Sequence, residues 1–89
     1  NYKYIVKVKA NMTPRYQSII NHQLHNDVNI DCNTAILYLN DNDGKTIFEN
    51  KEEVNSVKNR MIIFPSTLKH AGTTHTNTKH RMVINFNFL

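Results

Sequence analysis

Alternation of apolar and other residues with a period of two is the feature of this sequence that most limits its fold. It is clearest in residues 81–89, RMVINFNFL, where every second side chain is large and apolar. A period of two places neighbouring side chains on opposite faces of a β-strand, whereas an amphipathic helix needs a period near 3.6. No stretch has a convincing helical period. We therefore expect strands and no helix.

The same pattern defines the individual strands. The run TAILYLN at 34–40 is mostly apolar and is expected to be buried on both faces, and MIIF at 61–64 is expected to be a buried strand. The sequence DNDG at 41–44 has the Asp-Gly chemistry of a hairpin turn. Seven or eight short strands predict a sandwich, a barrel or a jelly roll. The expected strands are 2–10, 34–40, 46–49, 55–57, 61–64 and 81–89, with weaker stretches at 18–24 and 68–74.

The first expected strand, 2–10, has two unlike faces, and Pro14 is expected to keep residues 11–15 out of it. Its lysine face has two interpretations. It could guide phosphate or an acidic partner towards a site. The favoured interpretation is the solvated face of an edge strand, where lysine prevents pairing with other chains. The lysine face holds Lys3, Lys7 and Lys9, and the opposite face, expected to be buried, holds Tyr4, Val6, Val8 and Ala10.

Length and composition limit the class of protein further. The 89 residues, at 10.4 kDa, fit one small domain, 1–89, with a net charge of +4. No apolar run approaches the roughly 18–20 residues of a membrane span, and no basic-then-apolar leader opens the chain. A single cysteine, Cys32, excludes an internal disulfide and a cysteine-based zinc cluster. We expect a soluble, intracellular protein with no membrane partner.

Five histidines in a chain of this length are unusual, and one has a suggestive neighbour. In His25-Asn26-Asp27, an imidazole and a carboxylate at i and i+2 of an extended segment project to the same side, about 7 Å apart along the chain. With a third ligand from a distant strand, such a pair can form the two-His, one-carboxylate triad of Fe(II) enzymes. The H-x-D pair alone is a weak signal, since a histidine chosen at random is more often structural.

The order of the surrounding motifs makes the signal more specific. After the H-x-D pair come TAILYLN at 34–40, GKTIFE at 44–49, NRMIIF at 59–64, HAG at 70–72 and RMVINFN at 81–87. This order resembles the catalytic core of the Fe(II)/2-oxoglutarate-dependent oxygenases, in particular the prolyl-4-hydroxylase-like branch and its short phage-encoded members. The resemblance covers nearly the whole chain. It implies a double-stranded β-helix, which is a cupin-like jelly roll.

Carried over residue by residue, the resemblance implies a site. Its iron ligands would be His25, Asp27 and His70, and Arg81 would pair with the distal carboxylate of 2-oxoglutarate. Guanidinium suits that role because it is permanently charged and can grip a carboxylate bidentately. The hydroxyl of Tyr38 would bind the same carboxylate. The strand neighbours of Tyr38 and Arg81 are further candidates to line the pocket: Thr34, Ile36, Asn40 and Asn85.

Each of these residues also has a plainer interpretation. Tyr38 would ordinarily be a core residue, and Arg81 a solvated charge at the start of a strand. His75 could replace His70 as the third ligand, but it lies in a polar stretch only six residues before Arg81. His22 and His80 are expected to be structural or exposed.

The family resemblance implies the cofactors and the activity. Fe(II), 2-oxoglutarate and O2 would support hydroxylation of an unidentified substrate, with a protein side chain such as proline as one candidate. The alkylation-repair oxygenases carry a second arginine where this chain has Asn87, which argues against a nucleic-acid partner. The cytoplasm, including that of a phage-infected host, is the expected location. The alternative is a non-enzymatic jelly-roll module for binding or for a capsid or tail.

The resemblance also raises the question of completeness. Members of this family carry helices that cover one sheet, and this chain leaves almost no room for them. We therefore expect an exposed apolar patch, or a contact in a homo-oligomer, on the sheet that does not carry the metal ligands. A helical N-terminal portion missing from the chain, or a second copy, would cover that patch.

Overall fold

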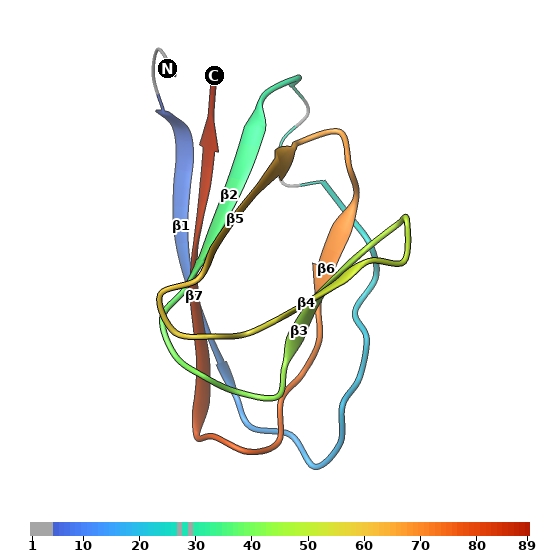
Figure 1. The fold of residues 1–89 in the computed structure, drawn as a ribbon, viewed down its shortest axis with the longest axis vertical. Coiled ribbons are helices and arrows are strands. Elements are labelled where there is room, and N and C mark those ends of the chain that lie inside the picture. Colours follow the sequence, from blue (N-terminus) through green and yellow to red (C-terminus); the bar gives the residue numbers. More distant parts are fainter. Residues whose placement is uncertain (1–4, 27, 29) are drawn as a thin grey trace.

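The computed structural model describes residues 5–26, 28 and 30–89. Within these ranges the chain forms seven strands in two sheets, which face each other across a shared interior (Figure 1). No helix occurs among them, so the described residues include none that could cross a membrane. The all-β expectation is confirmed. The strands are β1 (Ile5–Pro14), β2 (Asn33–Tyr38), β3 (Lys45–Phe48), β4 (Glu53–Asn55), β5 (Met61–Pro65), β6 (His70–Gly72) and β7 (His80–Phe88).

The larger sheet has the order β1-β7-β2-β5, and the smaller has the order β4-β3-β6, with antiparallel pairing in both. Residues 15–26 run along the β6 edge of the smaller sheet (Figure 1). Isolated bridges join Asn21 to Thr73 and His25 to His70. The irregular segment 15–26 therefore extends the smaller sheet beyond β6 at these two points.

The first strand differs from its prediction in three ways. It continues to Pro14, which is tolerated because β1 is an edge strand and Pro14 is its last residue. A β-bulge between Ile5 and Lys7 shifts its register against β7. The face expected to be buried is exposed instead, with Val8 52% accessible. On the lysine face, Lys7 and Lys9 are exposed and border the cavity described below, whereas Lys3 and Tyr4 lie outside the described residues.

Two other local predictions were wrong. The DNDG sequence does not form a hairpin turn, because β2 and β3, the strands that it connects, belong to different sheets. Instead the side-chain Oδ1 of Asn42 accepts a hydrogen bond from the Gly44 amide (2.9 Å) as the chain crosses over. The β5 strand is buried only in part, since Met61 and Ile63 are 49% and 62% exposed.

The apolar core between the sheets is small. It consists of five buried residues, with three half-buried ones packed against it. Its centre is aromatic, with the rings of Phe48 and Phe64 in an edge-to-face contact at 4.9 Å. The buried members are Ile36, Tyr38, Phe48, Phe64 and Val83, and the half-buried ones are Val54, Ile62 and Leu68.

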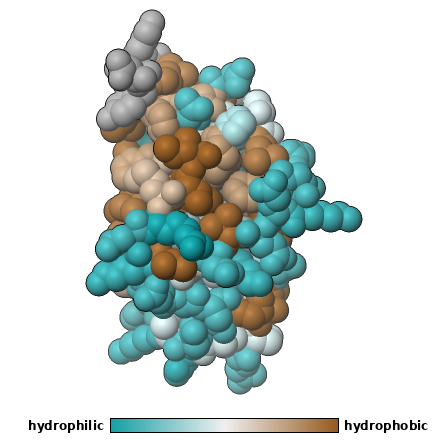
Figure 2. Space-filling view, in the orientation of Figure 1, coloured by the Kyte–Doolittle hydropathy of each residue, from teal (hydrophilic) through white to brown (hydrophobic). Residues whose placement is uncertain are grey.

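The outer face of the larger sheet is apolar and exposed, as expected for the sheet without the two histidines. A shallow apolar depression on it is lined by β1, β2, β5 and β7 residues. Figure 2 shows apolar side chains gathered over the upper part of the molecule, where β2, β5 and the C-terminal part of β7 lie, and hydrophilic ones over the lower end. The depression is lined by Ile5, Ala35, Met61, Ile63, Phe86 and Phe88.

Candidate functional site

A polar cavity of about 210 Å³ lies between the two sheets. Its walls come from β1, β2 and β7 of the larger sheet, from β3 and β6 of the smaller one, and from the segment that bridges to β6. It contains most of the predicted site residues that the structure describes. Those on its wall are His25, His70, Arg81, Ile36 and Asn85.

The two predicted histidine ligands come together at one end of this cavity. Two backbone hydrogen bonds join them, from the His25 amide to the His70 carbonyl (2.9 Å) and back (3.0 Å). Their ring centroids are 4.8 Å apart, and His70 is buried. Asp27, the third predicted ligand, lies outside the described residues. The described residues alone contain no group of three metal-binding side chains.

Arg81 is buried elsewhere on the cavity wall, and glycine makes room for it. A Cβ atom at Gly44 would lie 2.9 Å from Arg81 Cδ, and one at Gly72 would lie 3.3 Å from Arg81 Nη1. Such contacts are too close for an unchanged arginine position. The only two glycines of the chain thus both pack against this one side chain. Sequence analysis quoted both glycines within motifs but gave them no role.

The Arg81 side chain lacks a counter-ion among the described residues. It is only 7% exposed, it forms no ion pair with any of them, and its Nε has no hydrogen-bond partner there. Burial lowers the pKa of Arg81 from its ordinary value, because desolvation disfavours the charged form. Guanidinium nevertheless stays protonated in proteins. A buried cation of this kind favours binding of an anion into the cavity.

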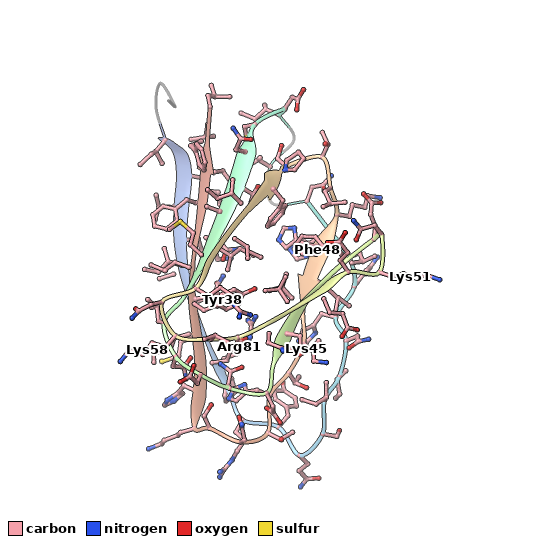
Figure 3. The ribbon with its side chains drawn as sticks, viewed as in Figure 1. Tyr38, Lys45, Phe48, Lys51, Lys58 and Arg81 are labelled. Carbon is pink, nitrogen blue, oxygen red and sulfur yellow. The ribbon has the colours of Figure 1, made fainter. Side chains whose placement is uncertain are left out.

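Tyr38 lies behind the cavity wall and beside Arg81 (Figure 3). It is fully buried, and its hydroxyl shares a 2.6 Å hydrogen bond with Thr46 Oγ1. Burial raises the pKa of Tyr38, although the Thr46 hydrogen bond and the charge of Arg81, whose Cζ lies 6.0 Å from the ring centroid, oppose that effect. Thr46 lines the cavity itself, and sequence analysis missed it. Its place in the GKTIFE motif was the available signal.

The remaining candidates, Thr34 and Asn40, hold neighbouring residues in place and do not line the cavity themselves. The hydroxyl of Thr34 donates a hydrogen bond to Oδ1 of Asn87 (2.9 Å), and Asn87 does line the cavity. Asn40 joins the ends of two strands by donating to the His80 carbonyl (2.8 Å) and accepting from the Met82 amide (3.1 Å).

His75, the alternative third ligand, is fully buried and does not line the cavity. Neither of its ring nitrogens has a hydrogen-bond partner in the described part of the chain. His22, expected to be structural or exposed, is exposed and lies on the cavity wall.

Two facing antiparallel sheets with a polar cavity between them define a small jelly roll. An RmlC-like cupin protein from Desulfovibrio desulfuricans has the same fold, with a TM-score of 0.55 over 91% of this chain and 82% of that one, at 11% sequence identity. The chain belongs to the 2OG-Fe(II) oxygenase superfamily, whose family model matches residues 12–89. Among curated proteins, none is similar enough in sequence to count as a match.

Proposed function

We propose that this protein is an Fe(II)- and 2-oxoglutarate-dependent dioxygenase that hydroxylates a C–H bond of its substrate. Membership of the superfamily supports the reaction class. The proposed metal ligands are His25, Asp27 and His70, and the proposed cosubstrate anchor is Arg81. A prolyl-4-hydroxylase-like activity on a protein side chain is the finer form of the proposal, and it rests on motif order alone.

The single observation that carries the proposal is the buried Arg81 without a counter-ion among the described residues. A carboxylate on the cavity side would supply the missing charge and accept hydrogen bonds from the guanidinium. Thr46, on the same wall, offers a hydroxyl to that carboxylate, and its bond to Tyr38 fixes its orientation. These residues bind and orient one end of a dicarboxylate.

The donors at the histidine end fit a divalent transition metal. Two imidazoles whose rings are 4.8 Å apart at the edge of a cavity are suitable ligands for iron, and Asp27 is two residues from one of them. Bound iron would supply the O2 chemistry that couples oxidative decarboxylation of 2-oxoglutarate to hydroxylation. The protein contributes the ligand geometry and the charge anchor.

Succinate formation tests this function without knowledge of the substrate. Protein loaded with Fe(II) under anaerobic conditions is mixed with 2-oxoglutarate and O2, and succinate is measured over time. We expect iron-dependent succinate formation that His70→Ala abolishes. His80→Ala, a matched histidine change away from the cavity, should leave it unchanged. Equal turnover by His70→Ala, or no turnover by wild-type protein that holds iron, would contradict the proposal.

A further inference from the structure

Two lysines of β1, Lys7 and Lys9, line the same cavity as His25, His70 and Arg81. Both lie on the side of β1 that faces the smaller sheet. The β-bulge after Ile5 sets this register, in which Lys7 pairs with Asn87 and Lys9 with Asn85. Neither lysine forms an ion pair with a described residue.

The lysines lie at the same level along the strands as the histidines, but on the opposite edge of the larger sheet from β5, the strand that contacts His70. The ring of His70 contacts that of Phe64, with centroids 5.0 Å apart. Across the larger sheet, Phe64 on β5 is the register partner of Thr34 on β2. Thr34 is in turn the partner of Asn87 on β7, and Asn87 is the partner of Lys7 on β1. A single row of neighbouring residues across the larger sheet therefore connects His70 to Lys7.

Arg81 lies at the other end of the same strands. It pairs with Thr13, four residues from Lys9 along β1, which corresponds to about 13 Å. The end carbons of 2-oxoglutarate are at most about 5 Å apart, since C–C bonds are about 1.5 Å long. The guanidinium of Arg81 lies against Gly72, two residues from His70 on β6, so a cosubstrate of this length held by Arg81 can extend towards the histidines. Lys7 and Lys9 border the cavity from the edge strand β1, which leaves them for another ligand.

The charges of the proposed complex lead to the same conclusion. Fe(II), the Asp27 carboxylate, doubly negative 2-oxoglutarate and Arg81 together sum to zero. Lys7 and Lys9 remain as two uncompensated positive charges on the wall of the same cavity. None of the described residues on the cavity wall is acidic. Lysine binds phosphate and carboxylate groups as a point charge.

We propose that Lys7 and Lys9 form an anion subsite for the substrate, so that the substrate carries a phosphate or carboxylate group. This inference rests on the proposed function for the meaning of "substrate", but the subsite itself is a property of the described residues. It differs from the edge-protection interpretation, in which the lysines need no ligand.

Titration with inorganic phosphate and with acetate, followed by amide NMR shifts on metal-free protein at low salt, tests the subsite. Four proteins are compared: wild type, the double variant Lys7→Gln/Lys9→Gln, Arg81→Met and Lys58→Gln. Lys58 is exposed and points away from the body of the molecule (Figure 3), so it is the matched control for loss of positive charge. Thermal melting of each protein confirms that it is folded.

We expect phosphate or acetate to shift amides of β1 and β7, with an affinity that falls as salt is raised. The double variant should bind about tenfold more weakly or not at all, as expected for loss of charged hydrogen bonds. Lys58→Gln and Arg81→Met should retain the β1 shifts. Tighter binding of phosphate identifies a phosphate-bearing substrate, and tighter binding of acetate a carboxylate-bearing one.

Three results would overturn the subsite: unchanged affinity in the double variant, equal loss in Lys58→Gln, or loss in Arg81→Met alone. Binding of 2-oxoglutarate to Mn(II)-loaded wild type is measured in parallel. Its absence would count against the proposed function and not against the subsite. Binding of 2-oxoglutarate without anion binding at the lysines would refute the subsite alone.

Discussion

The two faces of the larger sheet differ in the kinds of side chain that they bury and expose. On the inner face the side chains of Thr34, Arg81 and Asn87 are at most 7% exposed. On the outer face, Met12 and Ile63 are 63% and 62% exposed. The same strands supply both faces, since alternate residues point in opposite directions. In this sheet the inner face buries polar groups beside the apolar core, and much of the apolar outer face is open.

Burial of polar groups on the inner face is tolerated because they form hydrogen bonds with one another or can bind a ligand. Thr34 bonds to Asn87, and Tyr38 bonds to Thr46. Burying such groups without partners would cost several kcal/mol in total. Arg81 differs from these pairs, because it is a buried charge with no counter-ion among the described residues. The inner face therefore has buried polar groups that can bind a ligand. The outer face has exposed apolar side chains against which none of the described residues packs.

The largest expected effect comes from removing the charge of the inner face. Arg81→Met keeps a long side chain but should weaken 2-oxoglutarate binding by about 2–5 kcal/mol, the usual cost of truncating one side of a buried charge pair. Metal binding should stay nearly intact. Without the cosubstrate, the variant should melt at a higher temperature than wild type, because desolvation of an unpaired charge is removed.

Calorimetric titration of 2-oxoglutarate and thermal melting measure the two effects. Arg60→Met, at an exposed arginine, is the control and should change neither. A lower melting temperature for the cosubstrate-free Arg81→Met protein would mean that Arg81 already has a compensating charge.

The next effect concerns the buried hydrogen bond between Thr34 and Asn87 on the inner face. Asn87→Ala should lower the free energy of unfolding by about 1–3 kcal/mol, because Thr34 loses its buried partner. Asn55→Ala, the same change at an exposed strand position, should cost much less. Urea unfolding of both variants provides the comparison. Equal losses would show that the Thr34–Asn87 bond contributes nothing beyond strand propensity.

Sequence alone could predict the strands but not the direction of their faces. The period of two located β2, β3 and β7 closely, because alternation is a local property. It also identified Val8 and Lys9 as lying on opposite faces of one strand. Which face is interior depends on where the second sheet lies, and that is a long-range property. The rule that apolar residues lie inside therefore gave the wrong answer for β1.

The candidate site shows the same limit. Motif order led to His25, His70 and Arg81, which all line one cavity. The packing of Gly44 and Gly72 on Arg81 could not be read from the sequence, because the two glycines come from different strands or turns that meet only in the fold. Thr46 was missed although its place in the GKTIFE motif was a signal, because its bond to Tyr38 is formed only in the fold.

A smaller effect tests the glycine contacts with Arg81. A Cβ at Gly72 would lie 3.3 Å from Arg81 Nη1, so Gly72→Ala should displace the guanidinium by a few tenths of an ångström. We expect 2-oxoglutarate to bind a few-fold more weakly, by roughly 1 kcal/mol, as for a disturbed hydrogen bond. The same change in the Arg81→Met background should have no further effect on binding. Additive losses in the double variant would show that Gly72 acts independently of Arg81.

The smallest effect is expected on the outer face. Ile63 is 62% exposed, so Ile63→Lys removes little buried area and should change the free energy of unfolding by no more than about 0.5 kcal/mol. The new charge in the middle of the apolar face should nevertheless raise solubility and reduce self-association at high concentration, because burying a lysine in a contact is costly. Sedimentation of wild type and variant over a concentration series measures this, with Val57→Lys, at another exposed apolar residue outside the sheet, as the control. A large loss of stability in Ile63→Lys would mean that the outer face is already covered within a single chain, and the contrast between the two faces would be lost.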